Sequence, residues 1–218
     1  MQRILEPEIM DDEHQSAAYA KADFSWSNQW FVDMLGREFP DYMKKVIDLG
    51  CGPGDVPVRL ARASQRVHIT AVDGSGPMIR LTREAVSAAG LVGRIEAVEG
   101  YIPGLNLAEH SFDAVLCKDM IHHLPDPSVL WSEARRLGRA GAAICVMDLY
   151  RPESREIAAQ IVENVSGGED PVLKRDFFDS LCAAFTVEEI AEQLERAGLD
   201  LLVETISERH MVIKGYLP

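Results

Sequence analysis

The stretch Val46-Ile47-Asp48-Leu49-Gly50-Cys51-Gly52-Pro53-Gly54 decides the fold of this chain. An apolar run that ends in an acid and continues into three alternating glycines predicts a buried strand that turns sharply into a helix. Glycine has no Cβ and adopts positive φ at little cost, so the backbone of this turn can approach a ligand. A second apolar run, 67–72, leads to Asp73, and a carboxylate at that strand tip can accept both hydroxyls of a ribose. The two features together predict a ligand that carries a nucleoside.

The charge of the turn narrows the choice of nucleoside ligand. A dinucleotide fingerprint has the pattern G-x-G-x-x-G, whereas this chain has Asp55 at the position of the third glycine. Asp48 also places a carboxylate just before the turn, where it would repel a pyrophosphate. A ligand with an ammonium and a sulfonium would tolerate that carboxylate well.

The pattern D-L-G-C-G-P-G at residues 48–54 resembles motif I of the class I S-adenosylmethionine-dependent methyltransferases, which have a Rossmann-like fold. The resemblance is to the members of this family that methylate small molecules, and it implies S-adenosylmethionine (SAM) as cofactor. It implies that Asp48 binds the ammonium of SAM and that Asp73 binds the ribose. The backbone around the methionine part would be that of Gly50, Cys51, Gly52 and Gly54, with Gly74 and Met78 at and just after the next strand tip. In the family, an apolar side chain at the position of Met78 packs on adenine; a plain core role is the equal alternative.

The adenine end departs from the family pattern. The family commonly has Gly-Asp-Ala after its third strand, and the matching string here is Gly100-Tyr101-Ile102. Tyr101 could stack on the adenine ring or accept through its hydroxyl, while the backbone N–H of Ile102 meets a ring nitrogen. Tyr19 and Lys118 complete the expected cofactor contacts, Lys118 at the methionine moiety, although a solvated surface lysine is the alternative.

The expected catalytic residues follow the strand predicted at 111–117. They are Asp119, His122 and His123, because this loop resembles the family segment that runs along the cofactor toward the substrate. A histidine near its reference pKa is a plausible base for an O–H, N–H or S–H nucleophile, and a structural hydrogen bond is the alternative role. Adjacent histidines lack the i, i+4 spacing of a helical metal site, so no metal site is predicted.

A further set of substrate-side candidates lies after residues 142–148. Asp148 ends that apolar run and Tyr150 and Arg151 follow it, and carboxyl ends of parallel strands line the ligand crevice of open α/β sheets. An ion pair with a neighbouring acid is the alternative role for Arg151.

The alternation of apolar runs and helical patterns predicts an α/β fold, a three-layer doubly wound sandwich. The two last runs, 201–206 and 211–216, are joined by four residues, so they must form an antiparallel hairpin. The sheet is therefore expected to have seven strands, mostly parallel, as in the methyltransferases. Strands are expected at 46–49, 67–72, 94–98, 111–117, 142–148, 201–206 and 211–216, and helices at 12–39, 55–64, 77–89, 127–137 and 186–197.

One domain is expected over residues 1–218, because 218 residues suit a single α/β unit. Residues 1–45 would form an N-terminal helical cap, and residues 152–185 a helical insert that forms part of a substrate lid. A closed pocket of that kind suits a small substrate.

Composition excludes several partners. The net charge of −13 opposes a broad phosphate-binding face, so no nucleic-acid partner is expected. The acidic amino terminus does not resemble a signal peptide, and no stretch reaches the ~20 apolar residues of a membrane span, so no membrane partner is expected. Four scattered cysteines without a C-x-x-C pair suit buried thiols in a reducing cytoplasm. A monomer or homodimer is expected.

The resemblance implies an enzyme that moves a methyl group from SAM to an O, N, S or C atom of a small metabolite by in-line displacement. A methyltransferase acting on protein or tRNA, a non-catalytic SAM-binding protein and a nicotinamide oxidoreductase are the alternatives. Nothing in the sequence identifies the methyl acceptor.

Overall fold

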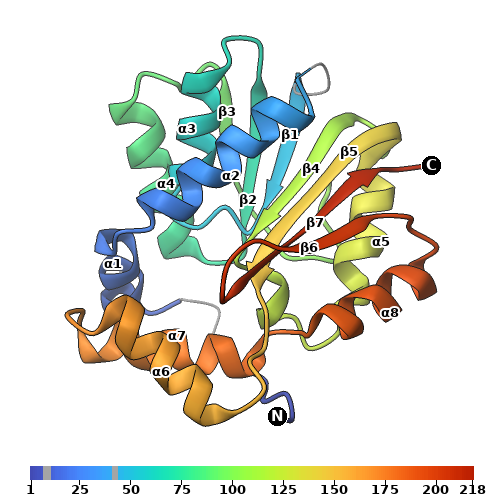
Figure 1. The fold of residues 1–218 in the computed structure, drawn as a ribbon. Coiled ribbons are helices and arrows are strands. Elements are labelled where there is room, and N and C mark those ends of the chain that lie inside the picture. The colour runs from blue at the N-terminus through green and yellow to red at the C-terminus, as the bar shows by residue number, and fades with distance from the viewer. Residues whose placement is uncertain (7–10, 41–43) are drawn as a thin grey trace.

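A seven-stranded sheet with the order β3-β2-β1-β4-β5-β7-β6 forms the centre of the computed structural model, which describes residues 1–6, 11–40 and 44–218 (Figure 1). All neighbouring strands pair in parallel except β7, which is antiparallel to both β5 and β6. The predicted doubly wound sheet and its C-terminal hairpin are confirmed. The strands are β1 (Lys45–Leu49), β2 (His68–Asp73), β3 (Ile95–Glu99), β4 (Phe112–Lys118), β5 (Gly138–Leu149), β6 (Leu202–Thr205) and β7 (His210–Tyr216).

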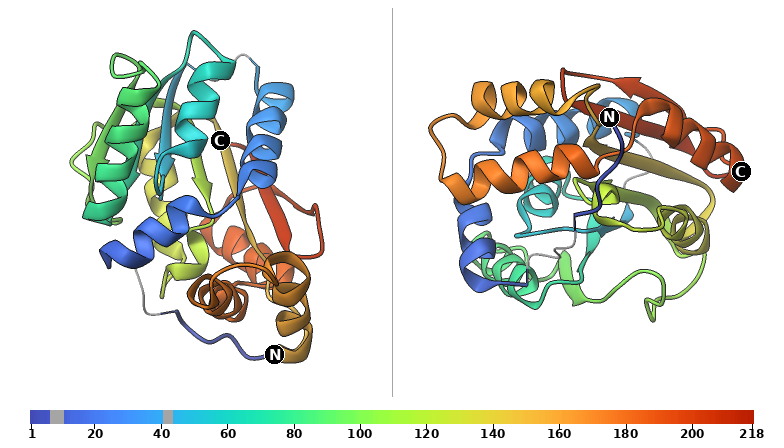
Figure 2. Two further views of the ribbon diagram at one scale, coloured as in Figure 1. Left: turned by 90° about the vertical axis from the view of Figure 1, so that its left-hand side faces the viewer. Right: turned by 90° about the horizontal axis from the view of Figure 1, so that it is seen from below.

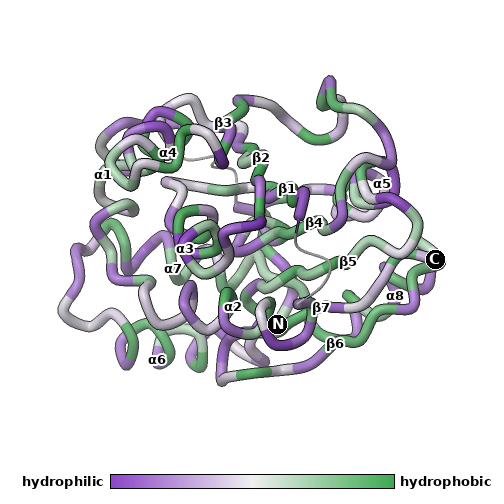
Figure 3. Tube along the Cα trace, turned by 90° about the horizontal axis from the view of Figure 1, so that it is seen from above, coloured by the Kyte–Doolittle hydropathy of each residue, from purple (hydrophilic) through white to green (hydrophobic). Residues whose placement is uncertain are grey.

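Helices cover both faces of the sheet, because alternate strand residues point to opposite sides. Val46 of β1 joins one apolar cluster with α2, α3 and α4, whereas Ile47 joins another with α5 and α8. In Figure 3 the hydrophobic colour runs along the central strands, and α6 alternates along its length as an amphipathic helix does. The helices are α1 (Glu13–Lys21), α2 (Ser25–Glu38), α3 (Asp55–Ala63), α4 (Gly76–Ala88), η1 (Ile121–His123, a 3₁₀ turn), α5 (Ser128–Leu137), α6 (Arg155–Ser166), α7 (Pro171–Ala183) and α8 (Val187–Ala197).

Local side-chain and glycine caps fix several helix ends. Thr186 and Glu189 form a reciprocal capping box at the start of α8, and Gly198 ends this helix in the left-handed conformation. Ser75 accepts a hydrogen bond from the backbone N–H of Met78 at the start of α4.

The single helix predicted at 12–39 is wrong, because the structure has two helices there. Helix α1 ends at Lys21, and Asp23 accepts a hydrogen bond from the backbone N–H of Ser25, which starts α2 in a new direction. Of the aromatic residues on α2, Phe31 is fully buried, whereas Trp26 is 57% exposed.

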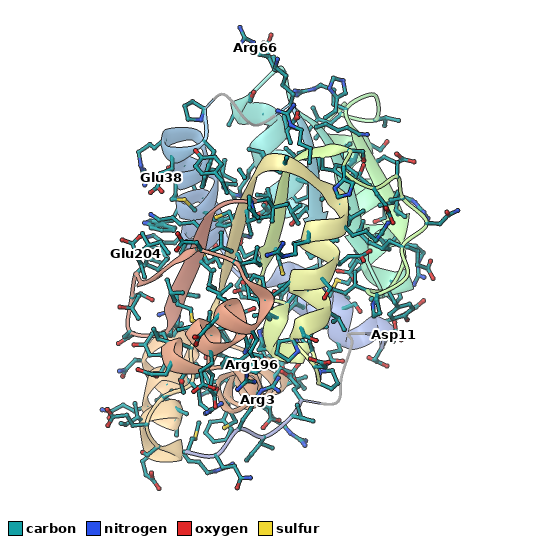
Figure 4. The ribbon with its side chains drawn as sticks, turned by 90° about the vertical axis from the view of Figure 1, so that its right-hand side faces the viewer. Arg3, Asp11, Glu38, Arg66, Arg196 and Glu204 are labelled. Atoms are coloured by element: carbon teal, nitrogen blue, oxygen red, sulfur yellow. The ribbon has the colours of Figure 1, made fainter. Side chains whose placement is uncertain are left out.

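The N-terminal residues and the helices α1, α6 and α7 lie beyond the carboxyl ends of the parallel strands (Figures 1 and 2). The backbone N–H of Ile4 donates to the carbonyl of Cys182 in α7, and the amino group of Met1 donates to the carbonyl of Glu153. Figure 4 accordingly shows Arg3 near one end of the molecule and Arg66 at the opposite end.

The edge of the sheet is tied to α2 by one lysine. Lys214 on β7 pairs with Glu38 at 2.8 Å and with Glu204 at 2.7 Å, and the two acids lie on the same side of the molecule (Figure 4). Among the helices of the described residues, none is long and apolar enough to cross a membrane.

Candidate functional site

A cavity of about 570 Å³ opens at the carboxyl ends of β1, β2 and β4. This is the place where open α/β sheets bind ligands. Most of the predicted site residues line it together: Tyr19, Asp48, Gly50, Cys51, Gly52, Asp73, Gly74, Met78, Tyr101, Ile102, Lys118, Asp119 and His123.

The glycine turn forms one wall of the cavity. The backbone N–H groups of Gly50 and Cys51 both donate to the carbonyl of Val72, at 2.8 and 2.9 Å, which fixes the turn against β2. Gly50 has a φ of 77°, and a Cβ there would lie 2.5 Å from the side chain of Met120. Only glycine fits this position. Gly54 is not among the lining residues of the described chain; with a φ of 88°, it starts α3 instead.

Asp48 is a buried carboxylate on this wall, only 2% exposed. Its Oδ1 has no hydrogen-bond partner among the described residues. Burial, together with the nearby charge of Asp73, raises the pKa of Asp48 to about 7. An unpaired buried carboxylate is costly, so its presence at the cavity indicates a cationic or donor-bearing ligand.

Asp73 connects the glycine turn to the start of α4. Its Oδ2 accepts from the backbone N–H of Gly52 and its Oδ1 from that of Ser75, both at 2.8 Å. Burial raises the pKa of Asp73 above its ordinary value, although these two hydrogen bonds oppose the change.

The predicted adenine end is apolar. The ring of Tyr101 packs over Gly74, where an added Cβ would lie 2.7 Å from it, and Tyr101 is 57% exposed at the rim. Met78 is buried and also lines the cavity.

Lys118 and Asp119 form an ion pair at the end of β4. Lys118 is 7% exposed, so it is not a solvated surface lysine. Asp119 has a φ of 52°, which is unusual for a residue other than glycine, and its Oδ1 has no hydrogen-bond partner in the part of the chain that the structure describes. Burial acts to raise the pKa of Asp119, but the charges of Lys118, His210 and His122 and the hydrogen bond from Lys118 together hold that pKa below the usual value.

The two adjacent histidines have different surroundings. His123 lines the cavity, whereas His122 is 3% exposed and lies behind the lining. His122 Nδ1 lies 2.6 Å from Asp148 Oδ1. Burial acts to lower the pKa of His122, but Asp148 outweighs it and raises the pKa above the usual value.

Glu6 contacts both rings, and sequence reasoning missed it. Its Oε2 lies 4.0 Å from His122 Nε2 and 3.6 Å from His123 Nδ1, and it accepts a hydrogen bond from Ser180 Oγ at 2.9 Å. Burial raises the pKa of Glu6 to about 7. No local signal could have found this residue, because the chain brings it to the turn from more than a hundred positions away.

The substrate-side roles suggested for Asp148, Tyr150 and Arg151 are wrong as direct contacts, since none of these residues lines the cavity. Asp148 is fully buried on His122, and Arg151 pairs with Glu189 at 2.5 Å, the alternative that the sequence left open. Tyr150 bridges to Phe185. The strand end is where the sequence places it, but the side chain of Asp148 turns toward η1 and that of Arg151 toward α8.

The N-terminal helices and the 152–185 segment contribute differently to the cavity. Residues of α1 and the start of α2, including Tyr19 and Phe24, line it. Their rings contact each other with centroids 4.7 Å apart. Among the described residues, none from 152–185 lines the cavity; α6 and α7 pack on each other and α7 contacts η1.

Comparisons with known proteins agree with this fold. Residues 46–141 match the sequence profile of a family described as "Methyltransferase domain". The chain is 32% identical over 124 residues to a ubiquinone biosynthesis O-methyltransferase of Xylella fastidiosa, covering 55% of this chain and 48% of that protein. It is 33% identical over 110 residues to a ubiquinone/menaquinone biosynthesis C-methyltransferase of Sinorhizobium fredii, covering 50% of this chain and 43% of that protein.

The chain thus spans about half the length of the curated relatives it matches. Among solved structures, a SAM-dependent methyltransferase from Aquifex aeolicus superposes with a TM-score of 0.72 at 17% identity, covering 95% of this chain and 99% of that one. At that identity the likeness concerns the fold. The profile match falls on the glycine turn and β4, which carry the cavity. Residues 46–141 therefore match a methyltransferase domain, and the chain as a whole has the Rossmann-like fold of the solved methyltransferase.

Proposed function

We propose that this protein transfers a methyl group from SAM to an O, N, S or C atom of a small molecule. The observation that carries the proposal is Asp48, whose buried Oδ1 has no partner among the described residues and whose side chain lines the cavity. A diphosphate would be repelled there, whereas the ammonium of SAM would supply the missing partner.

The residues present fit the cofactor. Gly50, Cys51 and Gly52 would hold the methionine part with their backbone, and the remaining lone pairs of Asp73 would bind the ribose hydroxyls. Met78 and Ile102 offer apolar contacts to adenine, with Tyr101 at the rim. Tyr19 and Lys118 also line the cavity and complete the proposed cofactor set.

Asp119 and His123 are proposed to contact the acceptor. Both line the cavity beside Lys118, and His122 is a positioning residue that Asp148 holds behind them. The bound cofactor supplies an activated methyl group, so the main task of the protein is to hold the acceptor in line and to exclude water. The N-terminal helices, which line the cavity, are proposed to act as its cap, and α6 and α7 to support the η1 turn as part of the lid.

A small acceptor is favoured over a macromolecule. The net charge of −13 opposes nucleic acid, and the relatives are named for the biosynthesis of ubiquinone and menaquinone. All four cysteines are buried free thiols, which favours a reducing compartment such as the cytoplasm, and we propose a monomer or homodimer there.

Calorimetry tests the cofactor directly. SAM and S-adenosylhomocysteine should bind at one site per chain, and NAD should not bind. Saturable binding of NAD without binding of SAM would refute the proposal. A protein that binds SAM but never yields S-adenosylhomocysteine with any small-molecule acceptor would instead support the non-catalytic alternative.

A further inference from the structure

The three side chains of Glu6, His122 and His123 gather at the η1 turn, beside the cavity that His123 lines. One ligand atom from each lies within 4.8 Å of the other two. They come from two distant parts of the chain, and both contacts of Glu6 use the same atom, Oε2. The geometry points to a binding site for one divalent transition-metal ion of the zinc type, with these three residues as ligands.

The orientation of His122 is the first argument. Asp148 Oδ1 lies 2.6 Å from His122 Nδ1, and the carboxylate also accepts from the backbone N–H groups of Ile121 and Leu149. A carboxylate in this position holds the imidazole proton on Nδ1 and leaves the Nε2 lone pair facing outward. That nitrogen faces the Oε2 atom of Glu6. The 4.0 Å between Nε2 and Oε2 is too long for a proton to bridge as a hydrogen bond.

The distances suit a metal ion better. Zinc bonds of about 2.0–2.2 Å to nitrogen and oxygen in a tetrahedral site place ligand atoms about 3.3 Å apart. The observed separations of 3.6 and 4.0 Å from Glu6 Oε2 would need to shorten by about 0.3 and 0.7 Å. Two imidazoles and one carboxylate are a donor set that zinc and other first-row divalent ions accept, with a fourth position open.

The surroundings hold the ligands in place. Ser180 Oγ donates to the same Glu6 oxygen, and the side chain of Glu6 is 5% exposed. Arg3 Nη2 donates to the carbonyls of His122 and Leu124 at 2.8 and 3.0 Å, which fastens the N-terminal segment to the histidine turn. The three proposed ligands are therefore supported from both segments that supply them.

A bound ion would also decide the role of His123. With a metal on Nδ1, the Nε2 of that ring carries the proton and can only donate a hydrogen bond. His123 would then hold the acceptor rather than act as a base. This inference does not depend on the proposed methyl transfer.

The test uses cobalt(II) as a spectroscopic probe on untagged protein treated with a chelator. We expect one cobalt ion per chain, with visible ligand-field bands that zinc abolishes by competition. Glu6→Gln and His123→Ala should each weaken cobalt binding at least tenfold, and Asp148→Asn by about 10–100-fold as an outer-sphere change. His68→Ala, at an exposed histidine on β2, is the matched control and should bind as the wild type does.

Circular dichroism of each metal-free variant separates loss of a ligand from loss of fold. The inference is overturned if the wild type binds no cobalt at 100-micromolar ion, or if the folded Glu6→Gln and His123→Ala variants bind it unchanged. Since SAM binding is measured separately by calorimetry, a failure here leaves the proposed cofactor site untouched.

Discussion

Replacing Asp48 with asparagine should stabilise the protein without cofactor and weaken its binding of SAM. The carboxylate is 2% exposed, and burial raises its pKa from 3.8 to about 7. Because the pKa is raised on folding, ionisation destabilises the folded state as the pH rises from the unfolded value toward the folded one. The destabilisation of the folded state by the ionised Asp48 carboxylate is complete above pH 7. A shift of about three units at 1.36 kcal/mol each gives a ceiling of about 4 kcal/mol.

The effect has a defined pH dependence. At pH 8 the free energy of unfolding of the variant should exceed that of the wild type by up to about 4 kcal/mol. At pH 5.5 the difference should be only about 2 kcal/mol, because this pH lies about midway between the unfolded and folded pKa values of Asp48. Urea unfolding of both proteins at the two pH values measures this. Asp200→Asn, at an exposed residue, is the control and should show no such difference. The reasoning would be refuted if the variant were less stable than the wild type at pH 8, or if its free energy of unfolding differed from that of the wild type by the same amount at both pH values.

The same substitution acts on the cofactor in the opposite direction. Loss of a hydrogen bond between charged groups should weaken SAM binding by about 1.5–3 kcal/mol, or roughly 10–150-fold. In the wild type, protonation of Asp48 competes with the ammonium, so affinity should fall about tenfold between pH 8 and pH 6. Calorimetry should find that fall missing from Asp48→Asn; an identical pH profile in both proteins would remove Asp48 from the ammonium site.

Three further substitutions test other residues of the site. Asp73→Ala should weaken SAM binding by about 1–3 kcal/mol in calorimetry, and unchanged affinity would count against its contact with the ribose. His123→Ala should lower the rate of S-adenosylhomocysteine release more than it lowers SAM affinity, whereas His68→Ala should leave both unchanged; an unaltered rate would end the assignment of His123 to the acceptor. Gly50→Ala should cost about 2–4 kcal/mol in unfolding experiments, because the added Cβ meets Met120 at 2.5 Å and the residue keeps a φ of 77°. Met120→Ala should recover part of that loss, and no recovery would show that the clash is not the cause.

Local signals made much of this fold predictable. The glycine turn, the acids at 48 and 73 and the four-residue connection before β7 each act within a few residues, so their consequences follow from the chain itself. The break between α1 and α2 was missed because aromatic residues continue at helical spacing on both sides of it. What ends α1 is the Asp23 side chain bonding the N–H of Ser25, a competition that periodicity does not show.

The site was predictable to the extent that it lies on strand ends. The sequence places Asp148 and Arg151 at the correct edge but not their direction, which depends on His122 and Glu189, partners far away in the chain. The position of Glu6 beside the two histidines could not be predicted from the sequence for the same reason. Its position depends on the docking of the first residues against α7, a tertiary contact without a motif.

The burial of all four cysteines has a practical consequence for experiments on this protein. Burial raises the pKa of each thiol above its ordinary value, so none should react readily with maleimide dyes at neutral pH. An introduced cysteine would then be the sole attachment point for a fluorophore, without removal of the natural ones. Ala20→Cys, at an exposed position on α1 at the cavity rim, would place such a reporter where arrival of a ligand changes its surroundings.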